Sequence, residues 1–429
     1  MDNTIYRLHK QNNEEMSEKD IKKRLEFVRA NEYMMHLMKC ALNNTTVDNK
    51  PEDVSWDLVY KVVSKNDMQG LTYYAIEKLK EEIPEKILKE WKEVREAIIY
   101  KKLMMEVERE EILADLSEEG ISFLMLKGCN IEKYYPQPGM RAMADNDILY
   151  GVIEAGDNGE YHVVGKDEEE RNETVKNTQL KLLDYMHQRG YKTKGMEDKD
   201  DACLKDDLYN FEMHRELLDR PLEYSWYYSN PWKNAIKNEN SDYMYHFSID
   251  DEYIFMIIHE YKHYTRSGCG VRFLTDIYLF LKAQQENMDW EYIRNELSKL
   301  NMNEFENEMR KLALDWLSPE KELKQEQVEK ILYMCACGTF GYNQIFLRRV
   351  YTGKVKELAK EGDNGLGKAK IRYFVSRLFP PDDFYVDRFP FFYKHRILRP
   401  FLTVFRIIRG GICYRKSIMS EIENVAKAK

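Results

Sequence analysis

The sequence lacks the features that mark several classes of protein. Its seven cysteines, at positions 40, 129, 203, 269, 335, 337 and 413, show no repeated CxxC spacing. Their scatter and odd number argue against a disulfide framework and against a structural zinc site. Nowhere do eighteen apolar residues run together, which argues against a typical transmembrane helix. The polar N-terminal segment has no apolar stretch of signal-peptide length, so we expect a cytoplasmic protein.

Positive charge is also scarce relative to negative charge. Lys and Arg number 66 against 75 Asp and Glu, which gives a net charge of -9. This balance argues against a protein that coats nucleic acid over its whole surface. Apolar residues, in contrast, are plentiful: 43% hydrophobic and 13% aromatic residues in a chain of 429 can fill the cores of two or three domains. The composition therefore predicts a globular protein.

Three parts of the chain differ in their hydrophobic pattern. From about Glu18 to Leu116, apolar residues recur every three or four positions among strong helix formers, which predicts helices. The period changes after Gly120, where the apolar run ISFLMLK predicts a buried strand. Helical patterns return from about Glu252. We therefore predict an α+β fold with a helical region over 1–117, a small mixed β-sheet core over 118–248 and a helical region over 249–429.

Shorter signals divide the predicted core. They predict a short helix over 130–135, a loop at 136–139, a strand over 145–150, a hairpin with its turn at 157–159, a charged helix over 168–189, and extended segments over 191–194 and 208–214. The acidic stretch MEDKDD, residues 196–201, predicts a loop between the last two extended segments.

Three carboxylates are the first candidates for a functional site. In a strand, residues two apart face the same way, so Asp145 and Asp147 would present both carboxylates about 7 Å apart. In the later segment, Glu212 and His214 share a polar face that can lie beside the aspartates. Three oxygen ligands suit Mg²⁺ better than zinc. Such a set serves in-line displacement at phosphorus, although an Asp-x-Asp pair alone is also a common solvated strand end.

Positively charged residues around the aspartates predict phosphate binding. A strand that ends at Lys127-Gly128 and opens onto a helix offers backbone N–H groups to an anion, because glycine permits close approach. Lys127 and Arg141 add positive charge. Taken alone, Lys127-Gly128 is better explained as an ordinary turn between a strand and a helix, and the aspartates downstream are what favour phosphate binding.

Six short motifs, read in order, resemble a known family. They are LKG, YPxPxxR, DxDIL, FEMH, HxxxH and GVRFLTDI, between Ile121 and Phe280. The segment resembles the uncharacterised bacterial nucleotidyltransferases, a branch of the polymerase-beta-like nucleotidyltransferase superfamily. The resemblance implies a mixed sheet backed by helices, Mg²⁺ carried by Asp145 and Asp147, and Glu212 as the third carboxylate. Two positions depart from the wider superfamily: Lys127-Gly128 stands where Gly-Ser is usual, and Asn146 stands where an apolar residue is usual. The hairpin around Asp157 resembles an insertion into the family's pattern.

A second motif suggests a different chemistry. The segment HEYKH, residues 259–263, matches the H-E-x-x-H pattern in which two histidines on a helix bind zinc and Glu260 acts as base. No further histidine follows at the spacing of known zinc proteases, so Asp276 or Glu286 would have to be the third ligand. The same helix is amphipathic, and the interpretation we favour is that His259 and His263 border its packed face. A third interpretation is that these histidines reach the acceptor or a phosphate.

The segment directly after this helix offers one more candidate. A Gly-x-Gly turn at Gly268 and Gly270 leads into a helix with Arg272 one turn before Asp276. The spacing allows an i, i+4 ion pair, which is usually structural and stabilises a helix by a few tenths of a kcal/mol. The functional interpretation is that Arg272 points to a triphosphate. We retain both interpretations.

The C-terminal part has the opposite charge balance to the rest. Residues 388–420 contain eight Lys and Arg, no acidic residue and several aromatic residues. Such a segment can contact RNA or an anionic membrane. The interpretation we favour is that its aromatic residues pack in a helical core and its basic residues face water.

These observations together predict a metal-dependent nucleotidyltransferase. It would transfer a nucleoside monophosphate from an NTP to an acceptor and release pyrophosphate, with Mg²⁺ or Mn²⁺ as cofactor. The sequence does not identify the acceptor, whether a small molecule, a saccharide, a protein or RNA. The alternatives are a zinc hydrolase built on His259, Glu260 and His263, and a non-catalytic nucleotide-binding protein.

Overall fold

A computed structural model describes most of the chain. The described residues are 18–196, 200–206, 208–219, 222–266, 268–338 and 366–379, together with 395, 397, 399–404, 419, 422 and 425. The chain forms two compact units, one of Met1–Lys262 with Gly270–Thr339 and one of His263–Cys269 with Phe340–Lys429. The second unit contains helix α14 (Leu366–Leu378). Most of the basic segment 388–420 lies outside the described residues.

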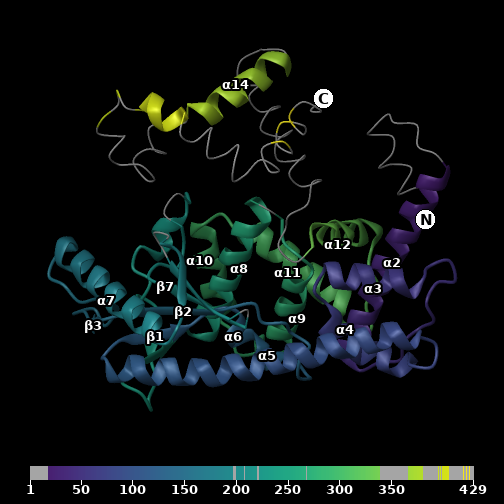
Figure 1. The fold of residues 1–429 in the computed structure, drawn as a ribbon, viewed down its shortest axis with the longest axis horizontal. Coiled ribbons are helices and arrows are strands. Elements are labelled where there is room, and N and C mark those ends of the chain that lie inside the picture. Colours follow the sequence, from purple (N-terminus) through teal and green to yellow (C-terminus); the bar gives the residue numbers. More distant parts are fainter. Residues whose placement is uncertain are drawn as a thin grey trace. The chain divides into compact units, whose positions relative to one another are not determined.

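The N-terminal part of the first unit is helical, as the sequence predicts. Its helices are α2 (Glu18–Asn43), α3 (Trp56–Lys65), α4 (Gln69–Ile76), the 3-10 turn Glu77–Leu79 and α5 (Glu85–Glu118). The apolar face of α2 packs on α3 and α4, and its Met34, Leu37 and Met38 are fully buried. Helix α5 runs from these helices to the sheet, where it contacts β1 (Ser122–Met125) (Figure 1).

A mixed seven-stranded sheet follows and confirms the predicted α+β class. Its strand order is β5 (Lys192–Met196), β6 (Asp200–Lys205), β7 (Tyr209–His214), β2 (Asn146–Gly151), β1, β9 (Met244–His246) and β8 (Ile236–Lys237). The pairs β2–β7 and β1–β9 are parallel, and the other pairs are antiparallel. The predicted hairpin is a separate two-stranded sheet of β3 (Ile153–Ala155) and β4 (Tyr161–Val163).

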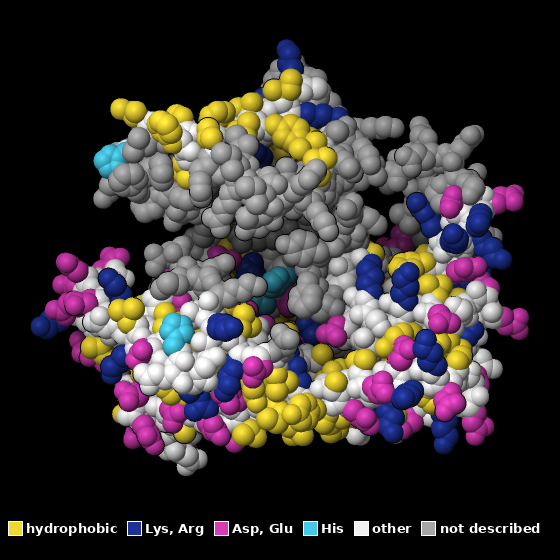
Figure 2. Space-filling model, viewed as in Figure 1, with side chains coloured by type: hydrophobic (Ala, Val, Ile, Leu, Met, Phe, Trp, Pro, Cys, Tyr) yellow, Lys and Arg dark blue, Asp and Glu magenta, His cyan; other side chains and the backbone are white. Residues whose placement is uncertain are grey.

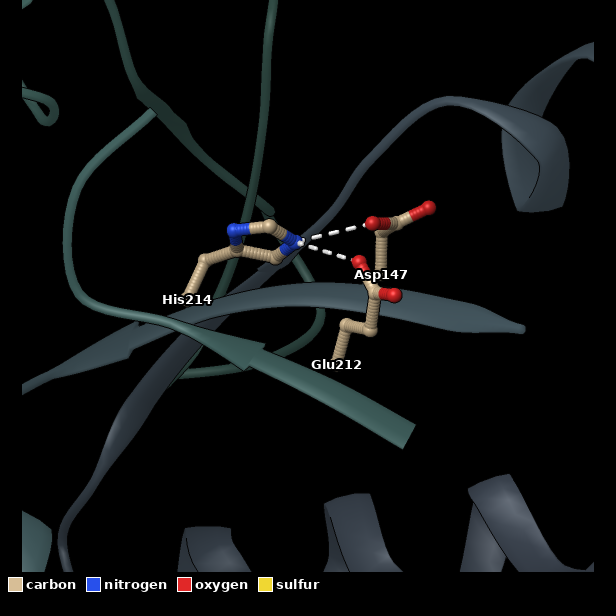
Figure 3. A group of neighbouring side chains, drawn as sticks. All are labelled: Asp147, Glu212 and His214. Carbon is tan, nitrogen blue, oxygen red and sulfur yellow. Dashed lines mark hydrogen bonds and ion pairs between the residues drawn. The ribbon is translucent and has the colours of Figure 1, made fainter. Parts of the chain in front are cut away.

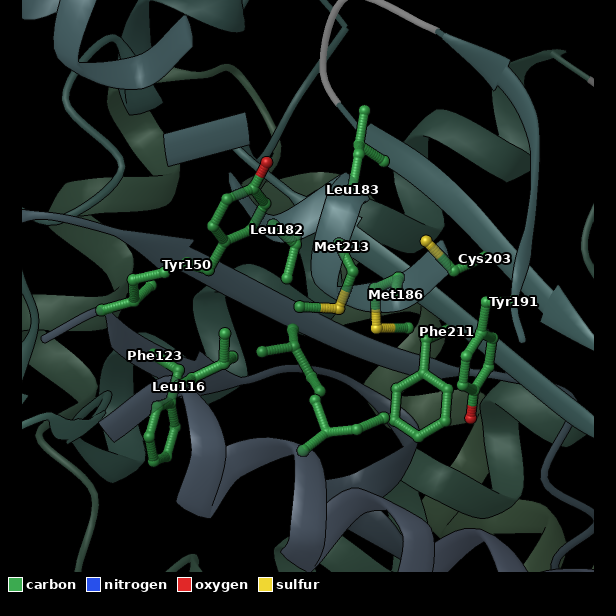
Figure 4. Packing of buried hydrophobic residues seen from close by; sticks show 13 residues of the cluster. Leu116, Phe123, Tyr150, Leu182, Leu183, Met186, Tyr191, Cys203, Phe211 and Met213 are labelled. Atoms are coloured by element: carbon green, nitrogen blue, oxygen red, sulfur yellow. The ribbon is translucent and has the colours of Figure 1, made fainter. Parts of the chain in front are cut away.

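One face of the sheet carries a hydrophobic core. Alternate residues of β2 and β7, including Ile148, Phe211 and Met213, pack against α5 and α7 (Glu168–Gln188). Figure 4 shows this cluster, in which Leu182 and Met186 of α7 meet the strands. Helix α7 is capped by Asp167, whose carboxylate accepts a hydrogen bond from the Glu170 N–H group. The core therefore fixes which residues of β2 and β7 face the other way.

Short helices and a C-terminal helical array complete the first unit. The turns after β1 are α6 (Gly128–Ile131) and the 3-10 turn Glu132–Tyr134, and Ser225–Tyr228 forms another 3-10 turn. The array consists of α8 (Ile249–Arg266), of which the residues up to Lys262 belong to this unit, α9 (Arg272–Gln284), α10 (Trp290–Lys299), α11 (Asn303–Leu317) and α12 (Gln325–Cys337). Helix α9 packs on α11 and on the turn after α6. This contact brings the C-terminal helices beside the loop that connects β1 and β2.

Three strands were not predicted from the sequence. Strands β8 and β9 are only two and three residues long. Strand β6 begins at Asp200, inside the acidic stretch predicted as a loop, and that part of the prediction was wrong. The second acidic residue of the strand, Asp201, is fully buried, and both its carboxylate oxygens accept hydrogen bonds from Gln179. A long-range partner on α7 thus overrides the low strand propensity of aspartate.

Helix α5 also has an exposed apolar stripe. Figure 2 shows hydrophobic side chains gathered over the middle of this helix, where Tyr100, Leu103 and Val107 are 60%, 54% and 55% exposed. Charged residues surround the stripe on both sides. No helix among the described residues has the length and hydrophobicity needed to cross a membrane.

Candidate functional site

Two neighbouring parallel strands bring acidic side chains together. Asp147 of β2 lies directly opposite Glu212 of β7 in the register, so both side chains leave the same face of the sheet. The sequence pattern predicts this placement. Asp147 is almost fully buried, whereas the Glu212 side chain is 30% exposed. The pair lies on the face opposite Ile148 and Met213, whose packing in the core holds the two strands in this register.

His214 is the third member of this group. Its Nε2 lies 2.8 Å from Oδ1 of Asp147 and 3.8 Å from Oε2 of Glu212. Figure 3 shows the imidazole edge facing both carboxylates. One ligand atom from each of the three side chains lies within 4.8 Å of the others. Within the described ranges, this is the only set of three or more His, Cys, Asp or Glu placed to share one ion.

Asp145 lies just outside this group. Strand β2 begins at Asn146, so Asp145 precedes the strand rather than sharing its pleat with Asp147. Burial raises the pKa of Asp145, and the charge of Asp147 raises it further, which shows that the two carboxylates lie in one electrostatic environment. The structure thus gathers Asp147, Glu212 and His214, with Asp145 beside them. The role of Asp145 as a metal ligand stays a prediction.

A lysine neutralises the centre of the group. Lys127 follows β1, and its Nζ lies 2.6 Å from Oδ1 of Asp147. Its backbone has φ +50, a conformation that non-glycine residues rarely adopt. Burial alone would raise the pKa of Asp147, but Lys127 and His214 outweigh it and hold that pKa well below its usual range. The Asp147 carboxylate is therefore ionised at neutral pH.

Glu212 has the opposite electrostatic behaviour. Burial, followed by the charges of Asp147 and Asp145, raises the pKa of Glu212 to about 7. Lys127 lowers the pKa but does not compensate for these effects. Two neighbouring carboxylates with pKa values pushed apart are a pattern found where one group is an acid or base and the other stays charged.

Arg141 anchors the loop between β1 and β2. Its Nε and Nη2 donate to the two carboxylate oxygens of Asp276 on α9, each at 3.0 Å. The hydroxyl of Tyr135 donates to the same carboxylate at 2.7 Å. The third guanidinium nitrogen, Nη1, lies against Gly128, where an added Cβ would approach it to 2.7 Å. Arg141 is thus held by Asp276 and directs Nη1 toward the turn predicted to bind phosphate.

The i, i+4 ion pair between Arg272 and Asp276 does not form, because Arg141 occupies the Asp276 carboxylate. Arg272 instead donates to the backbone carbonyl of Ala142 at 3.3 Å and lies 3.6 Å from Asp67. It therefore joins the start of α9 to the segment before Asp145. Its contact with a triphosphate stays a prediction.

Asn146 lies between the two aspartates on the core side of β2 and is fully buried. Its Oδ1 accepts hydrogen bonds from Arg109 of α5 at 2.9 Å and from Cys129 at 3.4 Å. Among the described residues, its Nδ2 has no hydrogen-bond partner. Sequence reasoning identified Asn146 as an unusual residue but missed Arg109, because nothing in the helical pattern of α5 distinguishes this arginine from its neighbours.

The HEYKH segment lies on helix α8. Ile254, Ile257 and Ile258 of this helix are buried, and Tyr261 packs edge-on against Phe305. In the described part of the chain, no third side chain joins His259 and His263 in a set that could bind a metal. Glu260, between them, has its pKa raised to about 7, first by burial and then by Asp276.

Comparison with known proteins agrees with this geometry. Residues 52–153 and 175–318, more than half of the chain, match the family model described as an uncharacterised nucleotidyltransferase. The unmatched segment between the two ranges contains β4 and the turn of the hairpin predicted as an insertion. Comparisons with curated proteins and with solved structures gave no match. The chain therefore belongs to the uncharacterised nucleotidyltransferase family, and its enzymatic class is nucleotidyltransferase with an unassigned acceptor.

Proposed function

We propose that the chain transfers a nucleoside monophosphate from an NTP to a hydroxyl-bearing acceptor and releases pyrophosphate. The observation that carries this proposal is the parallel register that sets Asp147 opposite Glu212. It places two carboxylates of different basicity side by side, with Lys127 and Arg141 nearby for the phosphates. Family membership supports the NTP as donor.

The residues of the site fit a divalent cation. Asp147, Glu212 and His214 each offer one ligand atom, and these three atoms lie within 4.8 Å of one another. The carboxylate oxygens of Asp147 and Glu212 are ligands that suit Mg²⁺ or Mn²⁺. Asp147 and Glu212 would hold the ion, with Asp145 adjacent. When bound, the ion would supply Lewis-acid stabilisation of the triphosphate and would acidify the acceptor hydroxyl.

The protein's own groups have separate tasks in this proposal. A carboxylate oxygen of Glu212, whose side chain is 30% exposed, receives the proton of the acceptor hydroxyl. Lys127 and Nη1 of Arg141 bind the triphosphate beside Gly128. Arg272 at the start of α9 provides a further positive charge. Asp276 orients Arg141 and does not touch the nucleotide.

Transfer of label from α-labelled NTPs tests the proposal. Wild type is incubated with each NTP, Mg²⁺ or Mn²⁺, and cell extract as the source of acceptor. We expect wild type to transfer label and the Asp145→Asn, Asp147→Asn double variant to lose transfer by at least about 100-fold, the scale of losing one preorganised electrostatic contact.

The control variant is Asp201→Asn, because Asp201 is a buried aspartate that hydrogen-bonds to Gln179 on the core side of the sheet. It should retain transfer. Transfer that persists in the double variant would refute the assignment of the site. No transfer by wild type, together with stoichiometric bound zinc, would instead support the zinc hydrolase.

A further inference from the structure

A buried histidine distinguishes this site from one made only of carboxylates. His214 is the last residue of β7, two positions after Glu212 and on the same face, and it is 1% exposed. Its Nε2 faces the oxygens of Asp147 and Glu212 at 2.8 and 3.8 Å. Ligand atoms that share one ion at about 2.1 Å typically lie about 3 Å apart, so the observed spacing suits a common ion.

A second carboxylate lies behind the histidine. Asp200 of β6 is directly opposite His214 in the antiparallel register, so the two side chains share a face of the sheet. Oδ2 of Asp200 lies 3.5 Å from Nδ1 of His214. Asp200 is itself 8% exposed. The imidazole therefore lies between Asp200 on one side and the Asp147 and Glu212 carboxylates on the other.

Histidines that bind a metal ion through one ring nitrogen commonly have a carboxylate beside the other ring nitrogen, as His214 has Asp200. A carboxylate that accepts the Nδ1 proton fixes the ring tautomer, orients the ring and makes Nε2 a better ligand. The register of β2 with β7 and that of β6 with β7 place Asp200, His214 and the Asp147 and Glu212 carboxylates on the same face of the sheet.

We propose that Asp200 and His214 form a carboxylate–imidazole pair that adds a nitrogen ligand to the site and makes it select Mn²⁺ over Mg²⁺. Mg²⁺ strongly prefers oxygen ligands, whereas first-row transition ions also accept imidazole, and Mn²⁺ retains an affinity for carboxylates. His214 is the ligand, and Asp200 is a positioning residue that acts through it. The inference rests on the metal site of the proposed function and deepens it by naming the ion.

Equilibrium binding of the metals alone tests this inference without any substrate. The affinities of metal-free wild type for Mn²⁺ and Mg²⁺ are measured by titration calorimetry, and free Mn²⁺ is followed by electron paramagnetic resonance. We expect wild type to bind Mn²⁺ at least about tenfold more tightly than Mg²⁺. His214→Gln and Asp200→Asn should each lower Mn²⁺ affinity by about 10–100-fold, as changes around metal-bound histidines do, and should change Mg²⁺ affinity much less.

A matched control separates positioning from folding. Asp201 neighbours Asp200 on β6, is fully buried and lies 3.4 Å from Arg215. Asp201→Asn should lower the melting temperature and leave the ratio of Mn²⁺ to Mg²⁺ affinity as in wild type. Melting temperatures of all the variants show whether each one folds. A merely structural role for Asp200 would make Asp200→Asn behave like Asp201→Asn.

The outcomes distinguish this inference from the function on which it rests. In one outcome, His214→Gln and Asp200→Asn leave the ratio of Mn²⁺ to Mg²⁺ affinity unchanged, while the Asp145→Asn, Asp147→Asn double variant binds neither ion. This outcome would overturn the inference and leave the nucleotidyltransferase site intact. Wild type that binds neither ion would overturn both the inference and the metal site. If the preference for Mn²⁺ over Mg²⁺ disappears in His214→Gln and Asp200→Asn and persists in Asp201→Asn, the carboxylate–imidazole pair of Asp200 and His214 is established.

Discussion

The two faces of the central sheet are held by different forces. Toward α5 and α7, β2 and β7 present Ile148, Phe211 and Met213, each fully buried among apolar side chains. On the opposite face, the same strands present Asp147 and Glu212, held by ion pairs and hydrogen bonds. Strand alternation produces both faces from one sequence, and a one-residue slip in register would exchange them.

This difference separates stability from chemistry. Burial of apolar area on the core face is favourable wherever the residues pack well. The charged face is locally unfavourable, because neighbouring carboxylates repel one another and raise the pKa of Glu212. The core face therefore fixes a register that the charged face would not adopt alone. Three predictions test this division of roles.

The largest expected change is a loss of stability on substitution of a residue of the core face. Leu182→Ala removes a fully buried side chain of α7 that packs on the sheet, and it should lower the free energy of unfolding by about 2–5 kcal/mol because a cavity replaces it. Leu180→Ala on the same helix, where the side chain is 53% exposed, should change the free energy by less than about 0.5 kcal/mol.

Urea unfolding of both leucine variants measures these changes, and Mn²⁺ titration of the folded protein shows whether the site is affected. We expect Leu182→Ala to leave metal affinity per folded molecule unchanged. A parallel loss of stability and metal affinity would show that the two faces are not independent.

The second effect is a pH dependence that originates beside the charged face. Burial and Asp276 raise the pKa of Glu260 from 4.5 to about 7, although Arg272, Arg141 and Lys127 oppose this, and His259 lies 3.8 Å away. A carboxyl group with a raised folded-state pKa contributes stability that is fully present below the unfolded pKa and is lost as pH rises through the folded pKa. Glu260 should therefore make the protein less stable as pH rises from about 4.5 to 7.

Melting temperatures of the metal-free protein between pH 4.5 and 8 check this expectation. Glu260→Gln should remove part of the decline that wild type shows in this window. Glu93→Gln, at an exposed position of α5, is the control and should follow the wild-type curve. Identical profiles for wild type and Glu260→Gln would contradict the prediction.

The parts of the fold that depend on local periodicity could be predicted from the sequence. Alternation in β7 predicted that Glu212 faces away from the core, and the register places it opposite Asp147. The helix over 168–189 and the hairpin turn at 157–159 follow from local signals in the same way. Their success reflects interactions between residues close in sequence.

Features that depend on distant partners could not be predicted. Asp276 had a suitable partner one turn away in Arg272, yet its carboxylate binds Arg141, 135 residues earlier in the chain. Strand β6 was hidden because Asp200 and Asp201 resemble loop residues until His214 and Gln179 are placed beside them. Asp145 was predicted inside β2 but precedes it, since strand ends are poorly defined by pattern alone.

The smallest effect concerns Asn146, the one polar residue of β2 on the core face. Arg109 donates to its Oδ1 at 2.9 Å, which ties β2 to α5 immediately between Asp145 and Asp147. A double-mutant cycle of Asn146→Ala and Arg109→Ala should give a coupling energy of about 1–2 kcal/mol. Either single variant already removes the hydrogen bond from the charged donor, so the second substitution cannot remove it again.

A control cycle pairs Asn146→Ala with Arg189→Ala, because Arg189 donates hydrogen bonds to Glu111 and Asp115 and not to Asn146. Strict additivity in the first cycle would show that apolar packing alone places the aspartates, whereas coupling confined to that cycle would show that α5 helps to hold the charged face through the core face.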